Sequence, residues 1–189
     1  MRNLFSENQK AILTLPPRND NEAEITARWN FPEGILKFDG QEFVFPEGFN
    51  AQASAKWLEE SLLSVYISVD APVEAECARC LTPVSLEISG ELGYLYYSHG
   101  AEVSDEQDGF FDEFGDYMPV EIKFFGRTVD VMPQIQESIY TLLPTKVLCK
   151  DDCKGLCPVC GKNLNEGSCS CINENTDPRL EALRNYTAE

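Results

Sequence analysis

The stretch CKDDCKGLCPVCGKNLNEGSCSC, residues 149–171, holds six of the chain's eight cysteines. The other two stand in the run CARC, at Cys77 and Cys80. Cysteines at such short spacings are typical of metal sites, because a tetrahedral Zn²⁺ ion takes four thiolate ligands at about 2.3 Å. The cysteine pattern is therefore the feature that decides how this part of the chain folds.

The centre of the run, CPVCG at residues 157–161, has the form of a zinc knuckle. Pro158 stiffens the turn between its two cysteines, and Gly161 allows the backbone to approach the metal-bound sulfur. A knuckle supplies only two ligands, so a closed site needs a second pair from the cysteines that follow the Gly- and Asn-containing loop. The predicted site therefore consists of Cys157, Cys160, Cys169 and Cys171.

Four cysteines remain, and their CxxC and CxxxC spacings are acceptable for metal ligands. We predict that they form a second four-thiolate site, which joins the middle of the chain to its C-terminal part. This pairing is inferred from the cysteines that are left over. We expect two Zn²⁺ ions in all, the second of them bound by Cys77, Cys80, Cys149 and Cys153.

Two other uses of the cysteines stay open at this point. An even number of cysteines suits a disulfide framework, but the N-terminal run MRNLFSENQKAIL does not have the pattern of an export signal. A redox CxxC motif is expected in the first turn of a helix after a strand. The residues around CARC instead predict strand, turn and strand, which disfavours redox catalysis.

Charge is distributed unevenly along the 189 residues, which are 43% apolar. The whole chain has 15 Lys or Arg against 32 Asp or Glu, a formal charge of −17. Residues 1–145 carry a balance of −16 and residues 146–189 a balance of −1. An acidic body repels a phosphate backbone and attracts a basic partner, so a direct RNA contact is plausible only through the C-terminal module.

No apolar run in the sequence approaches the roughly 20 residues of a membrane span, so we expect a soluble protein.

Several short stretches predict β-strands. Apolar residues alternate with polar ones over residues 49–57, 63–69 and 84–88, the last continuing to Tyr96. The alanines of residues 49–57 also allow a helix there. Asp39-Gly40 lies between the apolar runs 35–38 and 43–45 and is a hairpin signal. We expect an α+β fold whose body is mostly an antiparallel β-sheet or an open barrel, with one or two helices.

The remaining elements complete the predicted domain organisation. Residues 120–125 are expected to be the last strand, followed by a helix near 131–143 that Asp130 caps and Pro144 ends. Asp177-Pro178 predicts the start of a C-terminal helix over 179–186. We therefore divide the chain into an acidic β-rich body at 1–145 and a cysteine-rich, zinc-ribbon-like module at 146–189.

No catalytic machinery is visible in the sequence. His99 is the single histidine, and no GxSxG, phosphate-loop or HExxH motif occurs. All-cysteine zinc sites are usually closed and structural. Residues 101–116 hold seven acids, no base and three phenylalanines; they suit either a solvated loop or a docking strip for a basic protein. We expect neither enzyme activity nor a small-molecule substrate.

The cysteine pattern as a whole resembles that of a known family. A CxRCL pair between strands, a helix ending in LP, the run CxxDCKGLCPxCGxNLNxGxCxC and the tail DPRLxAL are similar to the YceD family, the large ribosomal RNA subunit accumulation proteins. The family pattern falls on Cys77, Arg79, Cys80 and Leu81, and on Cys149, Asp152, Cys153, Lys154, Gly155, Cys157, Cys160, Gly161, Asn163, Cys169 and Cys171.

The resemblance implies a cytoplasmic, non-enzymatic ribosome-biogenesis factor that supports the accumulation of large-subunit ribosomal RNA. Because the chain is acidic, we expect the body to bind a basic ribosomal protein or assembly factor, and the C-terminal module to contact either large-subunit ribosomal RNA or the same partner. The alternatives are a zinc-ribbon adaptor for protein interactions unrelated to ribosomes, and a thiol redox protein. Arg79, between the two upstream cysteines, suits either neutralisation of the thiolates or contact with an RNA phosphate.

Overall fold

The computed structural model describes residues 3–6, 8–18, 20, 22–59, 61–98, 117–122 and 126–171. The chain forms two compact units. The first combines Met1–Ala75 with Ser85–Thr145, and the second combines Glu76–Val84 with Lys146–Glu189. His99, the acidic segment 101–116 and the expected C-terminal helix at 179–186 lie outside the described residues.

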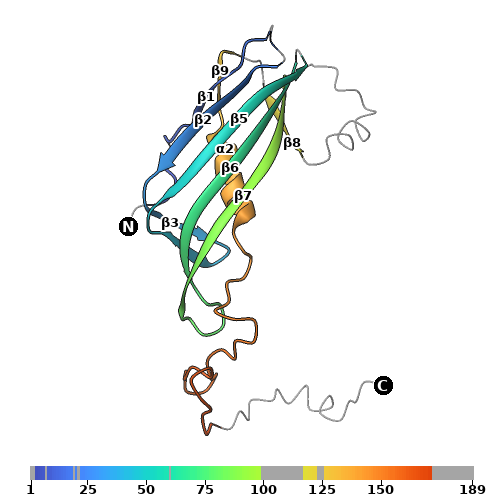
Figure 1. The fold of residues 1–189 in the computed structure, drawn as a ribbon. Coiled ribbons are helices and arrows are strands. Elements are labelled where there is room, and N and C mark those ends of the chain that lie inside the picture. Colours follow the sequence, from blue (N-terminus) through green and yellow to red (C-terminus); the bar gives the residue numbers. More distant parts are fainter. Residues whose placement is uncertain are drawn as a thin grey trace, which may run out of the picture. The chain divides into compact units, whose positions relative to one another are not determined.

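A seven-stranded sheet dominates the first unit (Figure 1). Its central strands are long, and its edge strands are shorter. The strands are β2 (Glu24–Phe31), β3 (Gly34–Phe38), β4 (Gln41–Phe45), β5 (Phe49–Glu59), β6 (Leu62–Glu76), β7 (Pro83–Ser98) and β8 (Tyr117–Ile122).

Strand β6 is the centre of this sheet. Its first part pairs antiparallel with β5, from Leu62 opposite Glu59 to Asp70 opposite Asn50, and its end pairs with β4 through Glu74 and Ala75. Strand β7 also pairs with β6 and with β8, the latter in parallel. The predicted, mostly antiparallel sheet is therefore confirmed, and it is an open sheet.

The core of the first unit follows from the period-two pattern of β5 and β6. In β5, small alanines are buried between Phe49 and Trp57 while the intervening polar residues face outward. In β6 the first four residues are all buried, and from Val65 to Ala75 the buried residues alternate in the same way. The hairpin expected at Asp39-Gly40 joins β3 to β4, and both residues have positive φ, at 49° and 76°, as a type I′ turn requires.

The helix α2 (Met132–Leu142) lies across one face of the sheet (Figure 1). Its buried residues are Met132, Ile135, Ser138 and Ile139. Among the described residues it is the one helix. Gly90 of β7 lies directly beneath Leu142, where a Cβ atom would collide with the leucine side chain, so this glycine lets the helix approach the strand closely.

Two expectations about this region need correction, and two of the strands had no prediction. Residues 120–122 of the predicted last strand lie in β8, and residues 123–125 lie outside the described residues. This strand is not the last, because β9 (Thr128–Asp130) follows and pairs with β1 (Ile12–Thr14). Strands β1 and β2 carry no strong alternation of fully buried residues and were not predicted. The N-cap is Val131 rather than Asp130, although the Asp130 carboxylate accepts a hydrogen bond from the Met132 N–H at 3.0 Å.

Two buried tyrosines tie β7 to α2. Tyr94 Oη lies 3.1 Å from both the Gln134 carbonyl oxygen and Ser138 Oγ, and the Tyr96 hydroxyl donates to Gln134 Oε1 at 2.7 Å. Burial raises the pKa of Tyr94 to about 12, and it raises the pKa of Tyr96 further. Both hydroxyls therefore stay protonated in the folded state at pH values where the unfolded chain ionises.

Among the described residues, no helix has the length and apolar character that a membrane span requires.

We expect the free energy of unfolding to fall as pH rises from about 10 to about 12, because unfolding releases protons from these tyrosines in that window. The Tyr94→Phe/Tyr96→Phe variant should be less stable at pH 7 by about 1 kcal/mol per lost hydrogen bond. It should also lose stability less steeply between pH 10 and 12. Urea unfolding at stepped pH measures both effects. Tyr66→Phe, at an exposed position, is the control; equal slopes in all three proteins would contradict this account.

Candidate metal centres

The CARC turn connects β6 to β7 and forms a knuckle. The Leu81 N–H donates to the Cys77 carbonyl oxygen at 2.9 Å, and the Cys77 N–H donates to the Thr82 carbonyl oxygen at 2.9 Å. These two bonds fold the chain tightly, so that both cysteine side chains lie on the inside of the turn and are buried. The expected position of the pair, at a turn between two strands, is confirmed.

The CPVC turn repeats this knuckle in the second half of the chain. The Gly161 N–H donates to the Cys157 carbonyl oxygen at 2.9 Å, and the Cys157 N–H donates to the Lys162 carbonyl oxygen at 2.8 Å. Gly161 has φ 72°, and Leu81 has φ 59° at the equivalent position of the first knuckle. A leucine in this left-handed region is strained, so the first knuckle keeps its shape despite the residue that occupies it.

The first knuckle contacts the segment that begins at residue 146. The Ala78 N–H donates to the Val147 carbonyl oxygen at 2.8 Å, and the Leu156 N–H donates to the Arg79 carbonyl oxygen at 3.1 Å. Gly155 has φ 74°, and a Cβ atom there would stand 3.0 Å from the Arg79 carbonyl oxygen, so a side chain would fit poorly. These contacts place two pairs of cysteines together, which we call the inner site: Cys77, Cys80, Cys149 and Cys153.

The remaining thiols form a separate group, which we call the outer site: Cys157, Cys160, Cys169 and Cys171. In each site all four Sγ atoms lie within 4.8 Å of one another. Both sites lie wholly within the second unit, since that unit includes residues 76–84 as well as 146–171. The structure thus brings together the two predicted sets of four cysteines, of which the inner set was inferred from the cysteines left over.

The sulfur geometry suits tetrahedral metal coordination. In the inner site, Cys77 Sγ lies 3.8 Å from Cys153 Sγ, and Cys80 Sγ lies 3.6 Å from Cys149 Sγ. A tetrahedron with metal–sulfur bonds of about 2.3 Å has edges of about 3.8 Å. All eight cysteines are described, and all are free thiols. The two clusters could each hold a metal ion.

Burial differs between the two sites. In the inner site only Cys149 is exposed, and the half-buried side chains of Val84, Leu148 and Leu156 pack against its buried cysteines. In the outer site only Cys157 is buried. The inner site is therefore shielded by apolar side chains, and the outer site is largely open to solvent.

The thiols of the inner site differ in pKa, and a bound cation would have to supply the positive charge that lets all of them ionise. Burial opposes ionisation of Cys77, but backbone N–H groups, led by that of Arg79, outweigh it and lower the pKa to about 6. Burial and the surrounding thiols raise the pKa of Cys149 to about 12. The side-chain amide of Asn165 lowers the pKa of Cys153. Four thiols this close cannot all ionise unless a cation compensates their charge, so metal binding must release protons.

The outer site also contains one thiol with a lowered pKa and another with a raised pKa. Backbone N–H groups of Cys160 and Val159 lower the pKa of Cys157 to about 6. A hydrogen bond with Cys160, together with partial desolvation of the sulfur by the neighbouring thiols, raises the pKa of Cys171 to about 12. Each site therefore contains at least one thiol whose pKa is lowered, and another thiol that a divalent cation would have to deprotonate.

Arg79 has a structural role that neither sequence interpretation foresaw. Its Nη1 donates to the carbonyl oxygens of Cys153 at 2.9 Å and Asp151 at 3.2 Å. The guanidinium thus fixes the Cys149–Cys153 loop through its backbone. Sequence reasoning also missed Asn165, whose Nδ2 donates to Cys153 Sγ at 3.3 Å. Its place in the loop between two outer ligands was the available signal.

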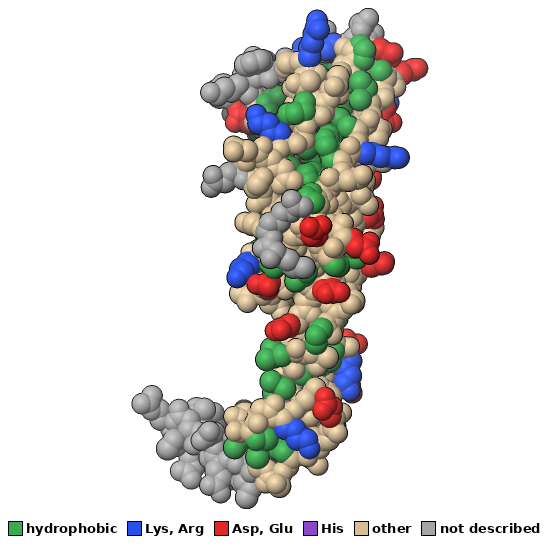
Figure 2. All heavy atoms as spheres, turned by 90° about the vertical axis from the view of Figure 1, so that its left-hand side faces the viewer, with side chains coloured by type: hydrophobic (Ala, Val, Ile, Leu, Met, Phe, Trp, Pro, Cys, Tyr) green, Lys and Arg blue, Asp and Glu red, His purple; other side chains and the backbone are tan. Residues whose placement is uncertain are grey.

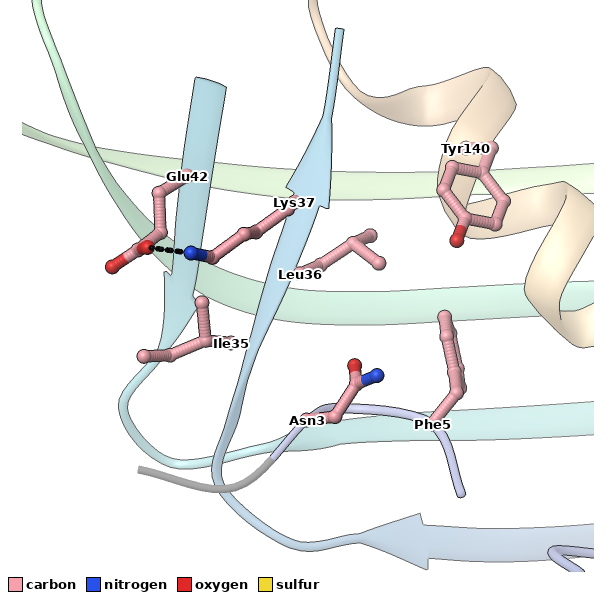
Figure 3. Close-up of a pocket in the computed structure, with 7 residues that line it drawn as sticks. All are labelled: Asn3, Phe5, Ile35, Leu36, Lys37, Glu42 and Tyr140. Atoms are coloured by element: carbon pink, nitrogen blue, oxygen red, sulfur yellow. Dashed lines mark ion pairs between the residues drawn. The ribbon is translucent and has the colours of Figure 1, made fainter. Parts of the chain in front are cut away.

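The first unit contains a separate pocket of about 450 Å³ (Figure 3). Figure 3 shows Phe5 and Tyr140 on one side of it and the ion pair between Lys37 and Glu42, 3.4 Å apart, on the other. Both members of that pair are at least half exposed. The pocket offers no buried polar group that would select a ligand, so it is a weaker candidate site than the thiol clusters. Its lining residues are Asn3, Phe5, Ile35, Leu36, Lys37, Glu42 and Tyr140.

We expect Cys77→Ser and Cys157→Ser to affect different sets of thiols, because a closed site needs all its ligands. With Zn²⁺ saturating both sites, Cys77→Ser should expose the other inner thiols to alkylation, and Cys157→Ser only the other outer thiols. Peptide mass spectrometry after alkylation reads each cysteine separately. Both tryptophans, Trp29 and Trp57, lie in the first unit, so their fluorescence should not change. Ser170→Ala is the control, and exposure of the same thiols in both variants would refute two separate sites.

Comparison with known proteins places this arrangement in a family. The chain is 33% identical over 117 residues to an uncharacterized protein of Mycobacterium tuberculosis, covering 61% of this chain and 51% of that protein. It is 30% identical over 69 residues to the Arabidopsis thaliana "Large ribosomal RNA subunit accumulation protein YCED homolog 1, chloroplastic", covering 36% of this chain and 20% of that protein. The chain thus spans about half the length of the mycobacterial relative. No solved structure matches the chain.

The family model for the "Large ribosomal RNA subunit accumulation protein YceD" matches residues 65–186. That range begins in β6 and includes both knuckles and all eight cysteines. The resemblance drawn from the cysteine pattern is confirmed, and the chain belongs to the YceD family of large ribosomal RNA subunit accumulation proteins.

Proposed function

We propose that the chain is a cytoplasmic ribosome-biogenesis factor that supports the accumulation of large-subunit ribosomal RNA and acts by binding rather than by catalysis. Family membership supports the ribosomal role. The observation that carries the binding mechanism is that each thiol cluster already supplies four ligands. A catalytic zinc needs an open coordination position, whereas a site closed by four thiolates serves structure.

In this proposal each site holds one Zn²⁺ ion. Inner-site zinc would fasten the first knuckle to the segment that starts at residue 146, and outer-site zinc would close the loop that ends at Cys171. Apolar burial among the residues of the second unit that the structure describes is limited, since the cluster around the inner site is small. Metal would therefore supply much of the folding free energy of this unit, as it does in other small metal-binding domains.

Charge supports a basic protein as the partner. The formal charge is −17 before any thiolate is counted, and a tetrathiolate zinc site adds two further negative charges. The face shown in Figure 2 has acidic side chains in groups and lysine and arginine side chains that are scattered among them. Such a surface attracts a basic ribosomal protein or assembly factor and repels RNA at long range.

RNA contact is assigned to the second unit, where five cations are described. These are Arg79, Lys146, Lys150, Lys154 and Lys162. Arg79 is already committed to the Cys149–Cys153 loop, and Lys150 lies 3.7 Å from Asp152. The remaining lysines are Lys146, Lys154 and Lys162, and Lys162 Nζ donates to the Ser168 carbonyl oxygen at 3.0 Å. These lysines suit a limited contact with RNA that is bound together with the protein partner, rather than a stand-alone RNA site.

Deletion of the encoding gene should lower the ratio of large-subunit to small-subunit ribosomal RNA, measured by electrophoresis of total RNA. Wild-type chain supplied in trans should restore the ratio. A chain with Cys77→Ser and Cys157→Ser should restore it poorly, because both sites would be incomplete. Ser170→Ala serves as the matched control.

The partner class is tested by affinity capture of the tagged chain at stepwise increasing salt. We expect a basic ribosomal protein or assembly factor that is released as salt rises, because screening weakens charge attraction. Recovery of bare RNA without such a protein would contradict the proposed roles of the acidic body and the C-terminal module.

In the deletion experiment, an unchanged ratio of large-subunit to small-subunit ribosomal RNA would instead favour an adaptor role unrelated to ribosomes.

A further inference from the structure

We propose that Asn165 couples the two thiol sites, so that metal in the outer site strengthens metal binding at the inner site. The proposal rests on the metal binding proposed above. Asn165 belongs to the outer loop by sequence, because it lies between Cys160 and Cys169. Its side chain nevertheless contacts an inner-site ligand, Cys153. It is a positioning residue that acts on metal binding through a ligand.

The outer loop lies against the segment that leaves the inner site. Leu156 and Asn163 form an isolated antiparallel bridge. The Leu164 N–H donates to the Gly155 carbonyl oxygen at 2.9 Å. Two segments of the chain, one after Cys153 and one after Gly161, are thereby held side by side. This pairing brings the loop between Cys160 and Cys169 to the inner site.

The Asn165 amide is bound at both of its ends. Its Oδ1 accepts the Lys154 N–H at 3.0 Å, and its Nδ2 donates to Cys153 Sγ at 3.3 Å and to Asn163 Oδ1 at 2.9 Å. A backbone N–H can only donate, so the atom facing Lys154 must be the oxygen. The NH₂ group therefore faces the sulfur, which is the orientation that favours a thiolate.

This donor matters because four thiolates around one divalent cation keep a net charge of −2. A hydrogen bond to a ligand sulfur offsets part of that charge and holds the ligand in place. Loss of such a partner typically lowers metal affinity about 10- to 100-fold. Asn165 would have this effect on Cys153 of the inner site.

The outer site controls whether Asn165 is in position. Cys160 and Cys169 are separated by eight residues, including Gly161 and Gly167, and such a loop is flexible unless its ends are joined. A metal ion that joins the ends reduces the entropy lost when Asn165 docks on Cys153. Coupling of two binding sites is reciprocal, so inner-site metal must strengthen outer-site binding by the same factor.

The test is Zn²⁺ titration of the full chain against a competing chelator under reducing conditions. Alkylation and peptide mass spectrometry report the occupancy of each site separately. Asn165→Asp keeps the shape and the acceptor for Lys154 but places a carboxylate oxygen against the thiolate. We expect about 10- to 100-fold weaker inner-site binding. Asn165→Ala, which removes the donor without adding charge, should show a smaller loss in the same direction.

The matched control is Ser168→Asp. It adds the same charge to the same loop at an exposed position, and the Ser168 atom that accepts from Lys162 Nζ at 3.0 Å is the backbone carbonyl oxygen, which the variant keeps. Inner-site affinity in this variant should stay near the wild-type value. Equal losses in Ser168→Asp and Asn165→Asp, or no loss in Asn165→Asp and Asn165→Ala, would overturn the assignment.

A second measurement tests coupling itself. Removing the outer site with Cys169→Ser and Cys171→Ser should weaken inner-site binding in the wild-type background. In the Asn165→Asp background the same change should have little further effect, because the connecting contact is already lost. Additive losses would overturn the coupling. Failure of the wild-type chain to bind metal would refute the proposed metal sites, which distinguishes that failure from failure of the Asn165 proposal alone.

Discussion

The second unit depends on the enforced proximity of thiols. Four sulfur atoms held within 4.8 Å of one another cannot all carry charge in the absence of a cation. The opposite pKa shifts of Cys77 and Cys149 express this conflict within one site. The same backbone turns that bring the thiols together also lower the pKa of Cys77 and of Cys157 through their N–H groups. The fold of the unit therefore determines its capacity to bind metal.

The two units solve the problem of stability in different ways. The first buries side chains from long paired strands and from α2, with Trp57, Tyr94 and Tyr96 among the largest fully buried. The described part of the second has turns, loops and the ends of β6 and β7, with one isolated bridge between Leu156 and Asn163 and a small apolar cluster around its inner cysteines. A unit of this size usually needs metals or disulfides to stay folded.

Prediction from sequence succeeded where one physical rule dominates. Period-two burial located β5 and β6, and knuckle spacing grouped the cysteines correctly. It failed where tertiary contacts decide: β1 has three residues and forms by pairing with β9, more than a hundred residues away. It also could not find the equivalence of the two knuckles, because Leu81 stands where Gly161 would predict glycine. The role of Asn165 depends on a contact with Cys153 that no spacing rule implies.

The central claim is that the two thiol clusters are metal centres that organise the second unit. The most direct test is metal content per chain, measured by elemental mass spectrometry on protein purified under reducing conditions, with reactive thiols counted before and after chelation. The account predicts two zinc ions and eight protected thiols, all of which become reactive when the zinc is removed. One metal ion or none, with cysteines that react freely or are oxidised before chelation, would contradict it.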